Sequence, residues 1–420
     1  MTFWAVQPGE RTSKACGSYD RVSSLDETVA LIPALRERFG ITRIADTTGL
    51  DRIAIPTFSA IIPHSPDLLS VYAGKGATRE AARVSAVMEA VERQAGAAPN
   101  LPTSVRPFRS IIEQLQLTDY NVRAEARTTE IECVSGRDLY SGEPVMVPLA
   151  MVQCPWGGPR LLAGGISTNG IAAGTTLFEA IYHALCEVIE RHVWSMCHAR
   201  SALVPKFYGG PSAPDVAHAP EIHFPSGTPC VEDMAVRITD AGFQLRAFWL
   251  RENDLPHVML ARVTDSTSAA PMTHTGMGCS LSPAHALLRA MTECVQSRVV
   301  DIQGAREDIL RAGEMHHVYS AHSRRQVAVP HGSWSFDLPA PHIEFSALAD
   351  HSAEDLAEDL MTLMNFLELA GKPPAVIVDL TPEACPVAVV RVVIPSFETT
   401  AFDGRIGPHV AQLFNPFAVC

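Results

Sequence analysis

Residues 85–93 are SAVMEAVER, and they follow a glycine turn at residues 74–76. Because an α-helix turns by about 100° per residue, Ser85, Glu89 and Glu92 share one face within roughly 60° of arc. Alanine, valine and methionine fill the positions between them. The segment therefore predicts a helix whose carboxylates lie at the edge of a buried surface.

The same charge pattern occurs twice more. Residues 184–191 are ALCEVIER and follow Gly174, and residues 290–298 are AMTECVQSR and follow Gly278. A single Glu-x-x-Glu pair is typical of a solvated helix face, but three such segments after three glycine turns indicate a shared role. Because burying an unpaired charge costs several kcal/mol or more, these segments predict a site that holds cations.

Candidate helices and strands interleave along the chain. Helical patterns with end caps cover residues 26–40 and 352–371. Residues 145–152 form a strand candidate, and residues 244–250 pair with residues 257–263 in a candidate hairpin. This order predicts an α/β or α+β fold, in which mixed sheets are layered with helices that carry the repeated Glu-x-x-Glu/Gln pattern.

Composition argues against several classes of protein. The chain has 420 residues, of which 47% are hydrophobic and 19% charged, so it can bury a large core. It has neither a run of ~20 apolar residues nor a signal-peptide start, and we expect a cytoplasmic protein without a membrane span. Its ten cysteines include no Cys-x-x-Cys pair, which argues against a disulfide framework or a zinc ribbon. A formal net charge of −13 argues against a nucleic-acid partner.

The repeated carboxylates are suited to Mg²⁺ and a nucleoside triphosphate. Mg²⁺ prefers oxygen ligands and is usually held by a carboxylate or two together with substrate phosphates. Lys75 lies between two glycines just before the first helix, where it can reach a phosphate beside the helix N-terminus. No Walker motif is present. The plainer alternative is a set of surface helices in which Arg93 and Arg191 are local ion-pair partners.

Zinc binding and cysteine catalysis are weaker alternatives. One segment contains His183, Cys186, His192, Cys197 and His198. Their spacing does not place four ligands on one side of a helix, as a tetrahedral zinc site requires. None of the ten cysteines lies in a recognisable nucleophile motif.

The motifs closely resemble the YcaO family. The resemblance rests on Lys75 with residues 85–93, on STNGIAAG at residues 167–174 with the glutamates that follow, and on residues 286–298. It spans roughly residues 14–407. That family binds ATP and Mg²⁺ and uses the γ-phosphate to activate a backbone amide oxygen of a ribosomally made peptide. The resemblance thus implies a YcaO-like fold, the cofactors ATP and Mg²⁺, and a precursor peptide as partner.

The resemblance also implies roles for individual residues. The implied nucleotide contacts are Arg21, Thr28, Lys75, Ser85, Asn169, Glu187 and Arg191. The implied Mg²⁺ ligands are Glu89, Glu92, Glu179 and Glu190. The implied catalytic residues are Arg191, Gln296 and Arg298.

We divide the chain on the same basis. Residues 1–65 form an N-terminal helix and strand region that contributes to the nucleotide site, and residues 66–420 form the catalytic core. Within the core, residues 204–230 are rich in Pro, Gly and Ser. We expect them to form a long loop, either an inert insert or a substrate lid.

Several products are consistent with this chemistry. Our first choice is an azoline, most simply a thiazoline, formed by cyclodehydration. A thioamide made from sulfide with a TfuA-type partner, a macrocyclic amidine, and a non-catalytic accessory role are the alternatives. Residues 391–398 resemble members that work with a TfuA-type partner or alone. An additional winged-helix domain for leader recognition does not fit in the length, so we expect that another protein delivers the peptide or that the enzyme binds it directly. A homodimer is a further possibility.

Overall fold

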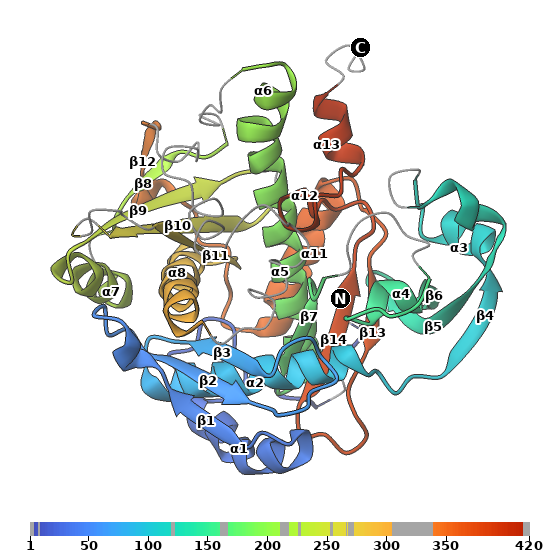
Figure 1. Ribbon diagram of the computed structural model, residues 1–420, viewed down its shortest axis with the longest axis horizontal. Helices are drawn as coiled ribbons and strands as arrows, with labels where there is room; N and C mark the ends of the chain where they lie inside the picture. The colour runs from blue at the N-terminus through green and yellow to red at the C-terminus, as the bar shows by residue number, and fades with distance from the viewer. Residues whose placement is uncertain are drawn as a thin grey trace.

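The computed structural model describes residues 4–414 except 7–8, 119–121, 160–166, 211–217, 226–227, 253–254, 266, 268–272 and 305–338. The described strands form three sheets (Figure 1). The three-stranded sheet has the order β1-β2-β3, and its strands are β1 (Arg43–Asp46), β2 (Thr57–Ile61) and β3 (Val71–Lys75). Both pairs of neighbouring strands in it are antiparallel.

Two larger sheets complete the framework. The six-stranded sheet has the order β4-β5-β13-β14-β7, with β6 beside β5; its strands are β4 (Thr103–Pro107), β5 (Glu130–Asp138), β6 (Pro144–Pro148), β7 (Ile171–Gly174), β13 (Val376–Asp379) and β14 (Ala388–Val393). The five-stranded sheet has the order β11-β10-β9-β8-β12; its strands are β8 (Glu221–His223), β9 (Phe243–Leu250), β10 (His257–Asp265), β11 (Thr273–Ser280) and β12 (His342–Glu344).

Three strand–helix units carry the repeated segments. The helices of these units are α2 (Arg79–Ala97) after β3, α5 (Leu177–His198) after β7, and α8 (Pro283–Gln303) after β11. A Cβ atom at Gly74, Gly174 or Gly278 would overlap backbone atoms of the helix that follows. Glycine thus lets each strand lie directly against its helix, which explains the glycine that precedes each segment.

Side-chain caps fix where two of these helices begin. The Thr78 side chain accepts a hydrogen bond from Ala81 N at the start of α2. Thr176 Oγ1 accepts from Glu179 N at 3.2 Å at the start of α5. Such caps stabilise a helix by roughly 1 kcal/mol each. The second cap places Glu179 in the first turn of α5.

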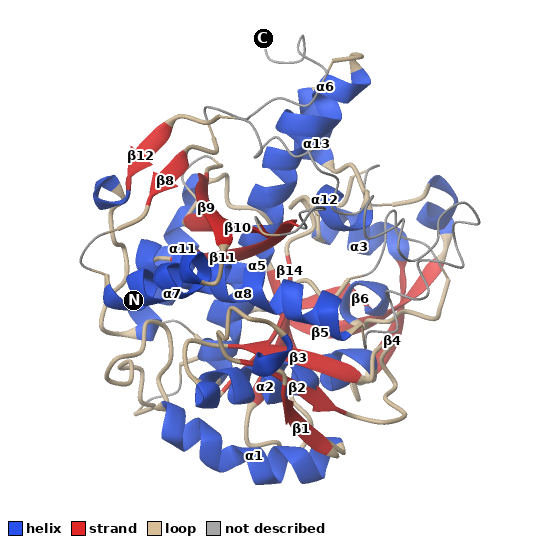
Figure 2. Cartoon of the chain, turned by 60° about the vertical axis from the view of Figure 1, so that its left-hand side comes forward, coloured by secondary structure: helices blue, strands red, loops and turns tan. Residues whose placement is uncertain are grey.

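The helix α5 runs through the middle of the molecule (Figure 1). It packs against β7 and β14 of the six-stranded sheet, against β11, and against α11 (Leu356–Leu369). The helix α8 lies between the five-stranded sheet and β3 (Figure 2). The helix α2 covers β2 and β3 and reaches β7. The three helices therefore lie around the region where the three sheets approach one another.

Shorter elements surround this centre. They are α1 (Leu25–Phe39), α3 (Phe108–Gln114), α4 (Leu149–Val152), α6 (Val204–Phe207), α7 (Pro229–Asp240), α12 (Thr400–Asp403) and α13 (Pro408–Leu413). None of the helices in the described residues combines the length and the apolar composition that a bilayer crossing needs.

The mixed α+β architecture expected from the sequence is confirmed. The helix expected over residues 26–40 is α1, which is capped by Ser24 and Glu27 and ends at Gly40 in the left-handed region with φ 66°. The hairpin expected from residue 244 is β9 with β10. The strand expected over residues 145–152 is wrong in its second half, because β6 ends at a proline and α4 follows it.

Residues 204–230 are not one continuous loop. The helix α5 continues through a π-helix (Ala199–Leu203) into α6, β8 follows, and α7 begins at Pro229. Residues 211–217 and 226–227 lie outside the described residues. The high proline and glycine content of the whole stretch concealed the helical residues at its start. The proposed division at residue 65 stays a prediction, and the three-stranded sheet runs across it.

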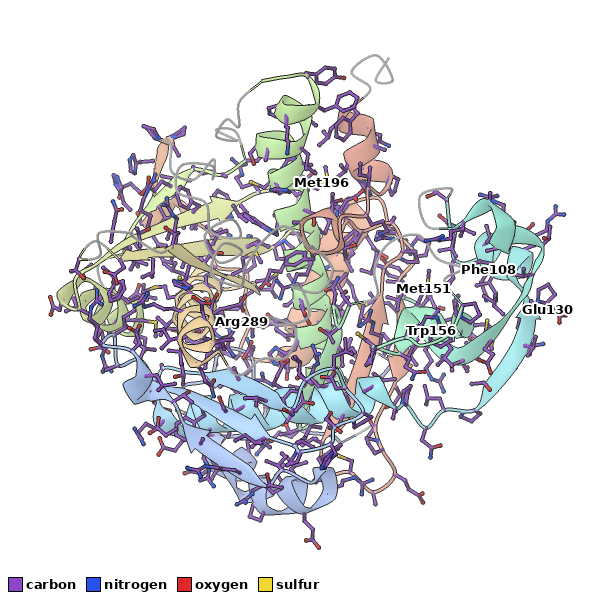
Figure 3. The ribbon with its side chains drawn as sticks, in the orientation of Figure 1. Phe108, Glu130, Met151, Trp156, Met196 and Arg289 are labelled. Atoms are coloured by element: carbon purple, nitrogen blue, oxygen red, sulfur yellow. The ribbon has the colours of Figure 1, made fainter. Side chains whose placement is uncertain are left out.

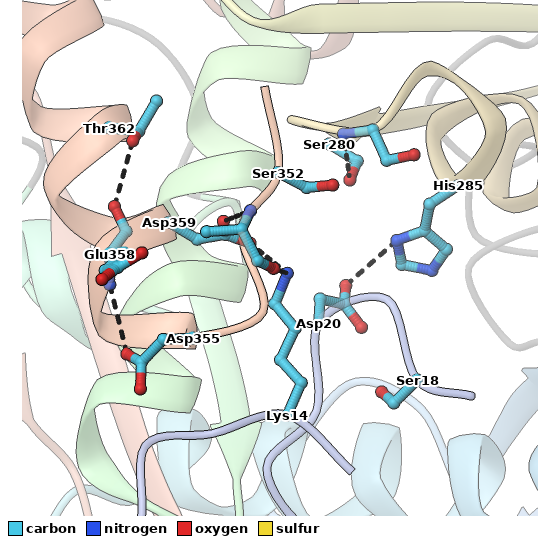
Figure 4. A network of polar contacts seen from close by, with 12 residues as sticks. Lys14, Ser18, Asp20, Ser280, His285, Ser352, Asp355, Glu358, Asp359 and Thr362 are labelled. Carbon is cyan, nitrogen blue, oxygen red and sulfur yellow. Dashed lines mark hydrogen bonds and ion pairs between the residues drawn. The ribbon is translucent and has the colours of Figure 1, made fainter. Parts of the chain in front are cut away.

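The N-terminal segment is tied to the start of α11 by a buried ion pair (Figure 4). Lys14 Nζ lies 2.6 Å from Asp359 Oδ2, and the two side chains are 5% and 0% exposed. Lys14 Nζ also donates to Ala353 O at 2.6 Å, and Asp359 Oδ1 accepts from Ala353 N at 2.6 Å. Burial raises the pKa of Asp359, although Lys14 opposes this. The pair holds the chain in the position from which Asp20 and Arg21 approach the centre of the molecule.

Replacing Lys14 with methionine is expected to lower the free energy of unfolding by about 3–5 kcal/mol, because Asp359 would stay buried without its cation. The loss should be larger at pH 8 than at pH 5, since Asp359 can regain neutrality by binding a proton only as the pH falls. Urea unfolding at both pH values measures the change. The control is Lys372→Met, which breaks an exposed pair with Glu368 and should cost about 1 kcal/mol or less. Equal losses in the two variants would contradict the role given to Lys14.

Candidate active site

A cavity of about 530 Å³ lies between the three strand–helix units. The side chains that line it from the repeated segments are Ser85, Glu89 and Glu92 of α2, Glu179, Glu187, Glu190 and Arg191 of α5, and Arg289 and Glu293 of α8. Residues of the N-terminal segment, among them Arg21 and Thr28, form another part of its wall. Segments that are far apart in the sequence thus bring their carboxylates to one space.

Backbone N–H groups beside β7 hold two of these carboxylates. Glu92 Oε1 accepts a hydrogen bond from Ala173 N at 2.8 Å, and Glu187 Oε2 accepts from Gly170 N at 3.3 Å. Glu89 makes no hydrogen bond or ion pair to any residue that the structure describes. Its carboxylate is therefore free to bind a ligand in the cavity.

Two cationic side chains, Lys75 and Arg191, lie beside these carboxylates in the cavity lining. Lys75 at the end of β3 forms an ion pair with Glu293 of α8. Arg191 lies 3.8 Å from Glu187 and 3.7 Å from Glu190, measured between guanidinium nitrogen and carboxylate oxygen. These longer separations allow the guanidinium to approach a phosphate without losing close hydrogen bonds to its neighbours.

The cavity wall holds more carboxylates than cations, and burial raises the pKa of several of these carboxylates. Burial, together with the nearby Glu89, raises the pKa of Glu92 well above its ordinary value. Burial raises the pKa of Glu187 to about 7 although Arg191 opposes it, and burial also raises the pKa of Glu190. Burial alone would raise the pKa of Glu293 as well, but Lys75 and Arg191 outweigh it and lower that pKa. An additional cation in the cavity would stabilise the charged forms of Glu92, Glu187 and Glu190.

The arrangement suits a metal ion shared with a ligand. Within the described ranges, no three His, Cys, Asp or Glu side chains converge closely enough to hold a metal ion by themselves. The carboxylates are instead distributed around the cavity. Mg²⁺ commonly takes one or two carboxylates and completes its shell with water and phosphate oxygens, so this donor set fits Mg²⁺ bound together with a nucleotide.

The N-terminal segment contributes a clamp. Arg21 Nη1 donates to Glu179 Oε1 at 2.9 Å, and the other oxygen of Glu179 accepts from Thr175 N at 3.0 Å. The Arg21 side chain is 40% exposed and the Glu179 side chain 1% exposed. The contact fixes the segment before α1 against the start of α5 and places a guanidinium at the cavity wall.

A second polar cluster at the cavity wall was not predicted from the sequence, and Figure 4 shows one of its contacts, between Asp20 and His285. Asp20 Oδ2 lies 3.3 Å from His285 Nδ1, 3.6 Å from His183 Nδ1 and 4.0 Å from Arg289 Nη1. The ring of His285 stacks on Tyr19 with centroids 4.8 Å apart. All five of these side chains line the cavity. Asp20 lies outside the repeated segments, and only the fold brings it to them.

Within this cluster, Arg289 indicates what kind of ligand the cavity can bind. It projects from α8 in the interior of the molecule (Figure 3) and lines the cavity. Its buried Nε atom, like the buried Nε2 atom of His183, has no hydrogen-bond partner among the described residues. A buried donor without a partner costs free energy unless a ligand supplies an acceptor. Phosphate oxygens would supply that acceptor.

The predicted residues do not all reach this cavity. Arg21, Thr28, Lys75, Ser85, Glu89, Glu92, Glu179, Glu187, Glu190 and Arg191 line it. Gln296 lines an adjacent cavity and donates through Nε2 to Ala73 O at 2.7 Å. Asn169 lines neither cavity. Arg298 also lines neither, because its Nε binds Asp51 at 2.9 Å and its guanidinium packs on the Phe243 ring. The structure thus places Arg298 in a buried ion pair outside both cavities, and its catalytic role stays a prediction from the resemblance.

Two arginines of α8 provide a matched test of these roles. Arg289→Met is expected to weaken binding of the ATP analogue AMPPCP, since a hydrogen bond to a charged group contributes roughly 1.5–3 kcal/mol. Arg298→Met should leave AMPPCP affinity unchanged and instead lower the free energy of unfolding by about 3 kcal/mol, because Asp51 loses its partner. Calorimetry and urea unfolding measure the two effects. Equal losses of AMPPCP affinity in both variants would contradict this assignment.

Comparison with known proteins bears on this site. Residues 73–398 match the family model described as YcaO cyclodehydratase, which binds ATP and Mg²⁺. This chain belongs to the YcaO family. As a YcaO protein it is an ATP-dependent cyclodehydratase with ATP and Mg²⁺ as its cofactors. The matched range includes all three repeated segments, whereas Arg21 and Thr28 precede it.

Relatives extend the likeness beyond the matched range. An uncharacterised protein of Methanothermobacter thermautotrophicus is 33% identical over 415 residues, covering 97% of this chain and 98% of the relative. A protein in the tfuA 3′ region of Rhizobium leguminosarum bv. trifolii is 32% identical over 404 residues, covering 93% and 91%.

Solved structures share the fold. The YcaO protein of Methanopyrus kandleri bound with AMPPCP and Mg²⁺ has a TM-score of 0.68 at 24% identity, covering 95% of this chain and 98% of that chain. A heterocyclase in complex with substrate and cofactor also has a TM-score of 0.68, at 18% identity, covering 94% of this chain and 55% of that chain.

Proposed function

We propose that this YcaO protein phosphorylates a backbone amide oxygen of a ribosomally made precursor peptide and closes an azoline ring there. Our first choice of product is a thiazoline, formed by a cysteine side chain. The observation that supports the proposal is the cavity in which carboxylates of three helices stand beside Lys75, Arg191 and Arg289. This combination can bind a metal-bound triphosphate and stabilise charge on a transferring phosphoryl group.

Different side chains of the cavity would bind the metal ion and the phosphates. Glu89, Glu92, Glu179 and Glu190 would hold Mg²⁺, which supplies neutralisation of phosphate charge. Lys75 forms an ion pair with Glu293, the charge of Arg191 also acts on Glu293, and both cations would bind the terminal phosphate. This network is partly buried, with the Lys75 and Arg191 side chains each 21% exposed, so its interactions are stronger than they would be in bulk water.

Amide activation needs this environment because an amide oxygen is a poor nucleophile. As phosphate is transferred to it, negative charge spreads over the phosphoryl oxygens, and placed cations lower the barrier. A neighbouring side chain then attacks the activated carbon, and phosphate leaves with the amide oxygen as the C=N bond forms and the amide nitrogen loses its proton. One ATP is consumed for each ring, and the peptide loses the elements of one water.

A thioamide is the second candidate product. The relative in the tfuA 3′ region of Rhizobium leguminosarum, 32% identical to this chain, favours it. A TfuA-type partner would then assist, and sulfide would replace the cyclising side chain as nucleophile. The activation step and its residues would be the same. The mass of a precursor peptide after incubation with Mg-ATP tests the proposal and separates the two products.

A further inference from the structure

A second cavity, of about 390 Å³, adjoins the first. The two cavities share Ile171 and a row of charged side chains that consists of Lys75, Glu89, Glu92, Glu187, Arg191 and Glu293. The first cavity extends from this row toward the N-terminal segment and the cluster around Asp20. The second extends from the opposite side of the row toward β3 and the C-terminal half of α8. The charged row therefore has open space on both sides.

One face of α8 forms a wall of the second cavity. Glu293, Gln296, Ser297 and Val300 all line it, at the spacings of three, four and seven residues that place side chains on one helix face. Thr275 of β11 lines it beside them. Beyond the shared row, this wall is uncharged and made of small or amide side chains.

The remaining charge in the second cavity is already neutralised. Arg93 Nε donates to Asp67 Oδ2 at 2.8 Å, and Arg93 Nη2 donates to Asp67 Oδ1 at 3.0 Å. The Asp67 side chain is 0% exposed. This two-point ion pair leaves Arg93 little capacity to bind an external carboxylate or phosphate. The second cavity thus differs in character from the first, where buried donors lack partners.

We infer that the second cavity holds the peptide segment that contains the reacting amide, with its carbonyl oxygen toward Lys75 and Arg191. The inference rests on the proposed function and adds the location and type of the substrate segment. Phosphoryl transfer places the attacking and leaving oxygens roughly in line. A nucleotide in the first cavity with its terminal phosphate at the charged row must therefore receive its acceptor from the opposite side, and the second cavity is the space on that side.

The lining also sets a preference among peptides. Glu89, Glu92 and Glu187 face the second cavity as well as the first. An aspartate or glutamate beside the reacting amide would meet these carboxylates and would be repelled. The residues that flank the modified amide are therefore small and uncharged.

Binding of a short peptide tests the inference without turnover. The probe is acetyl-Gly-Cys-Gly-amide, observed by saturation-transfer NMR with the full-length protein, AMPPCP and Mg²⁺. Wild-type protein should give a signal, and Ser297→Trp and Val300→Phe, which fill the second cavity from α8, should lose it. Ile302→Trp is the matched control, because Ile302 is 44% exposed on the same helix and lines neither cavity. It should keep the signal.

AMPPCP affinity provides the second measurement. It should stay within about twofold of wild type in all three variants, the usual size of a surface effect. A second probe, acetyl-Asp-Cys-Asp-amide, should give no signal with wild type. The inference is overturned if wild type does not bind the first probe, if both filling variants still bind it, or if they lose AMPPCP together with it. If the inference holds but no precursor peptide is modified, the proposed function fails separately.

Discussion

Replacing Glu89 or Glu190 with glutamine, or Arg191 with alanine, is expected to abolish Mg²⁺-dependent nucleotide binding while the protein stays folded. Each change removes a metal ligand or a phosphate clamp from the cavity and leaves core packing in place. Loss of one such group in this partly buried site should cost about 2–4 kcal/mol, as for oxyanion donors. Calorimetric titration with AMPPCP measures the affinity, and removal of Mg²⁺ with a chelator should have the same effect on wild type.

The control for the carboxylate variants is Glu80→Gln. Glu80 is exposed in the first turn of the same helix as Glu89 and does not line the first cavity. Its replacement should therefore leave AMPPCP binding unchanged. Burial raises the pKa of Glu190, so the folded protein disfavours its charged form. Glu190→Gln should therefore keep the wild-type Tm without nucleotide. Wild-type affinity in all three site variants, with unaltered circular dichroism, would contradict the site.

Helix periodicity located the carboxylates that α2 and α5 contribute to the cavity lining before the fold was known. Ser85, Glu89 and Glu92 recur at spacings that only a helix brings to one face, and the neighbouring apolar residues indicated that this face lies at the edge of a buried surface. The glycine before each segment was visible too, but its cause was not. That cause is the contact between strand and helix backbones, which depends on how each strand packs.

Helical geometry also separates the two arginines of α8, although the resemblance did not. Arg298 follows Arg289 by nine residues, which places them about 180° apart around the helix. Arg289 is four residues before Glu293 and shares its face of α8. When that face lines the cavity, Arg298 must point away from it.

Long-range contacts could not be predicted in this way. Lys75 and Glu293 are 218 positions apart, and their ion pair arises from the packing of α8 against β3. Asp20 reaches the cavity because Lys14 ties its segment to α11. Such long-range contacts have no local pattern.

Incubation of the protein with its cognate precursor peptide and Mg-ATP, without sulfide, is expected to lower the peptide mass by one water for each azoline. The amide oxygen leaves with phosphate, and the attacking side chain and the amide nitrogen each lose a proton, so the atoms removed add up to one water. Mass spectrometry of the intact peptide measures the change. Omitting ATP or Mg²⁺ should prevent it, and Arg191→Ala should prevent it as well, because that variant lacks the phosphate clamp beside Glu190.

The alternative products give different masses from the same activation step. Exchange of the amide oxygen for sulfur raises the mass and requires a sulfur donor, so a gain that depends on sulfide would replace the azoline by a thioamide. A loss of one water that persists after every Cys, Ser and Thr of the core peptide is replaced would indicate attack by an amine and a macrocyclic amidine. In each case the nucleotide cavity keeps its role, because all three products begin with the same phosphorylated amide.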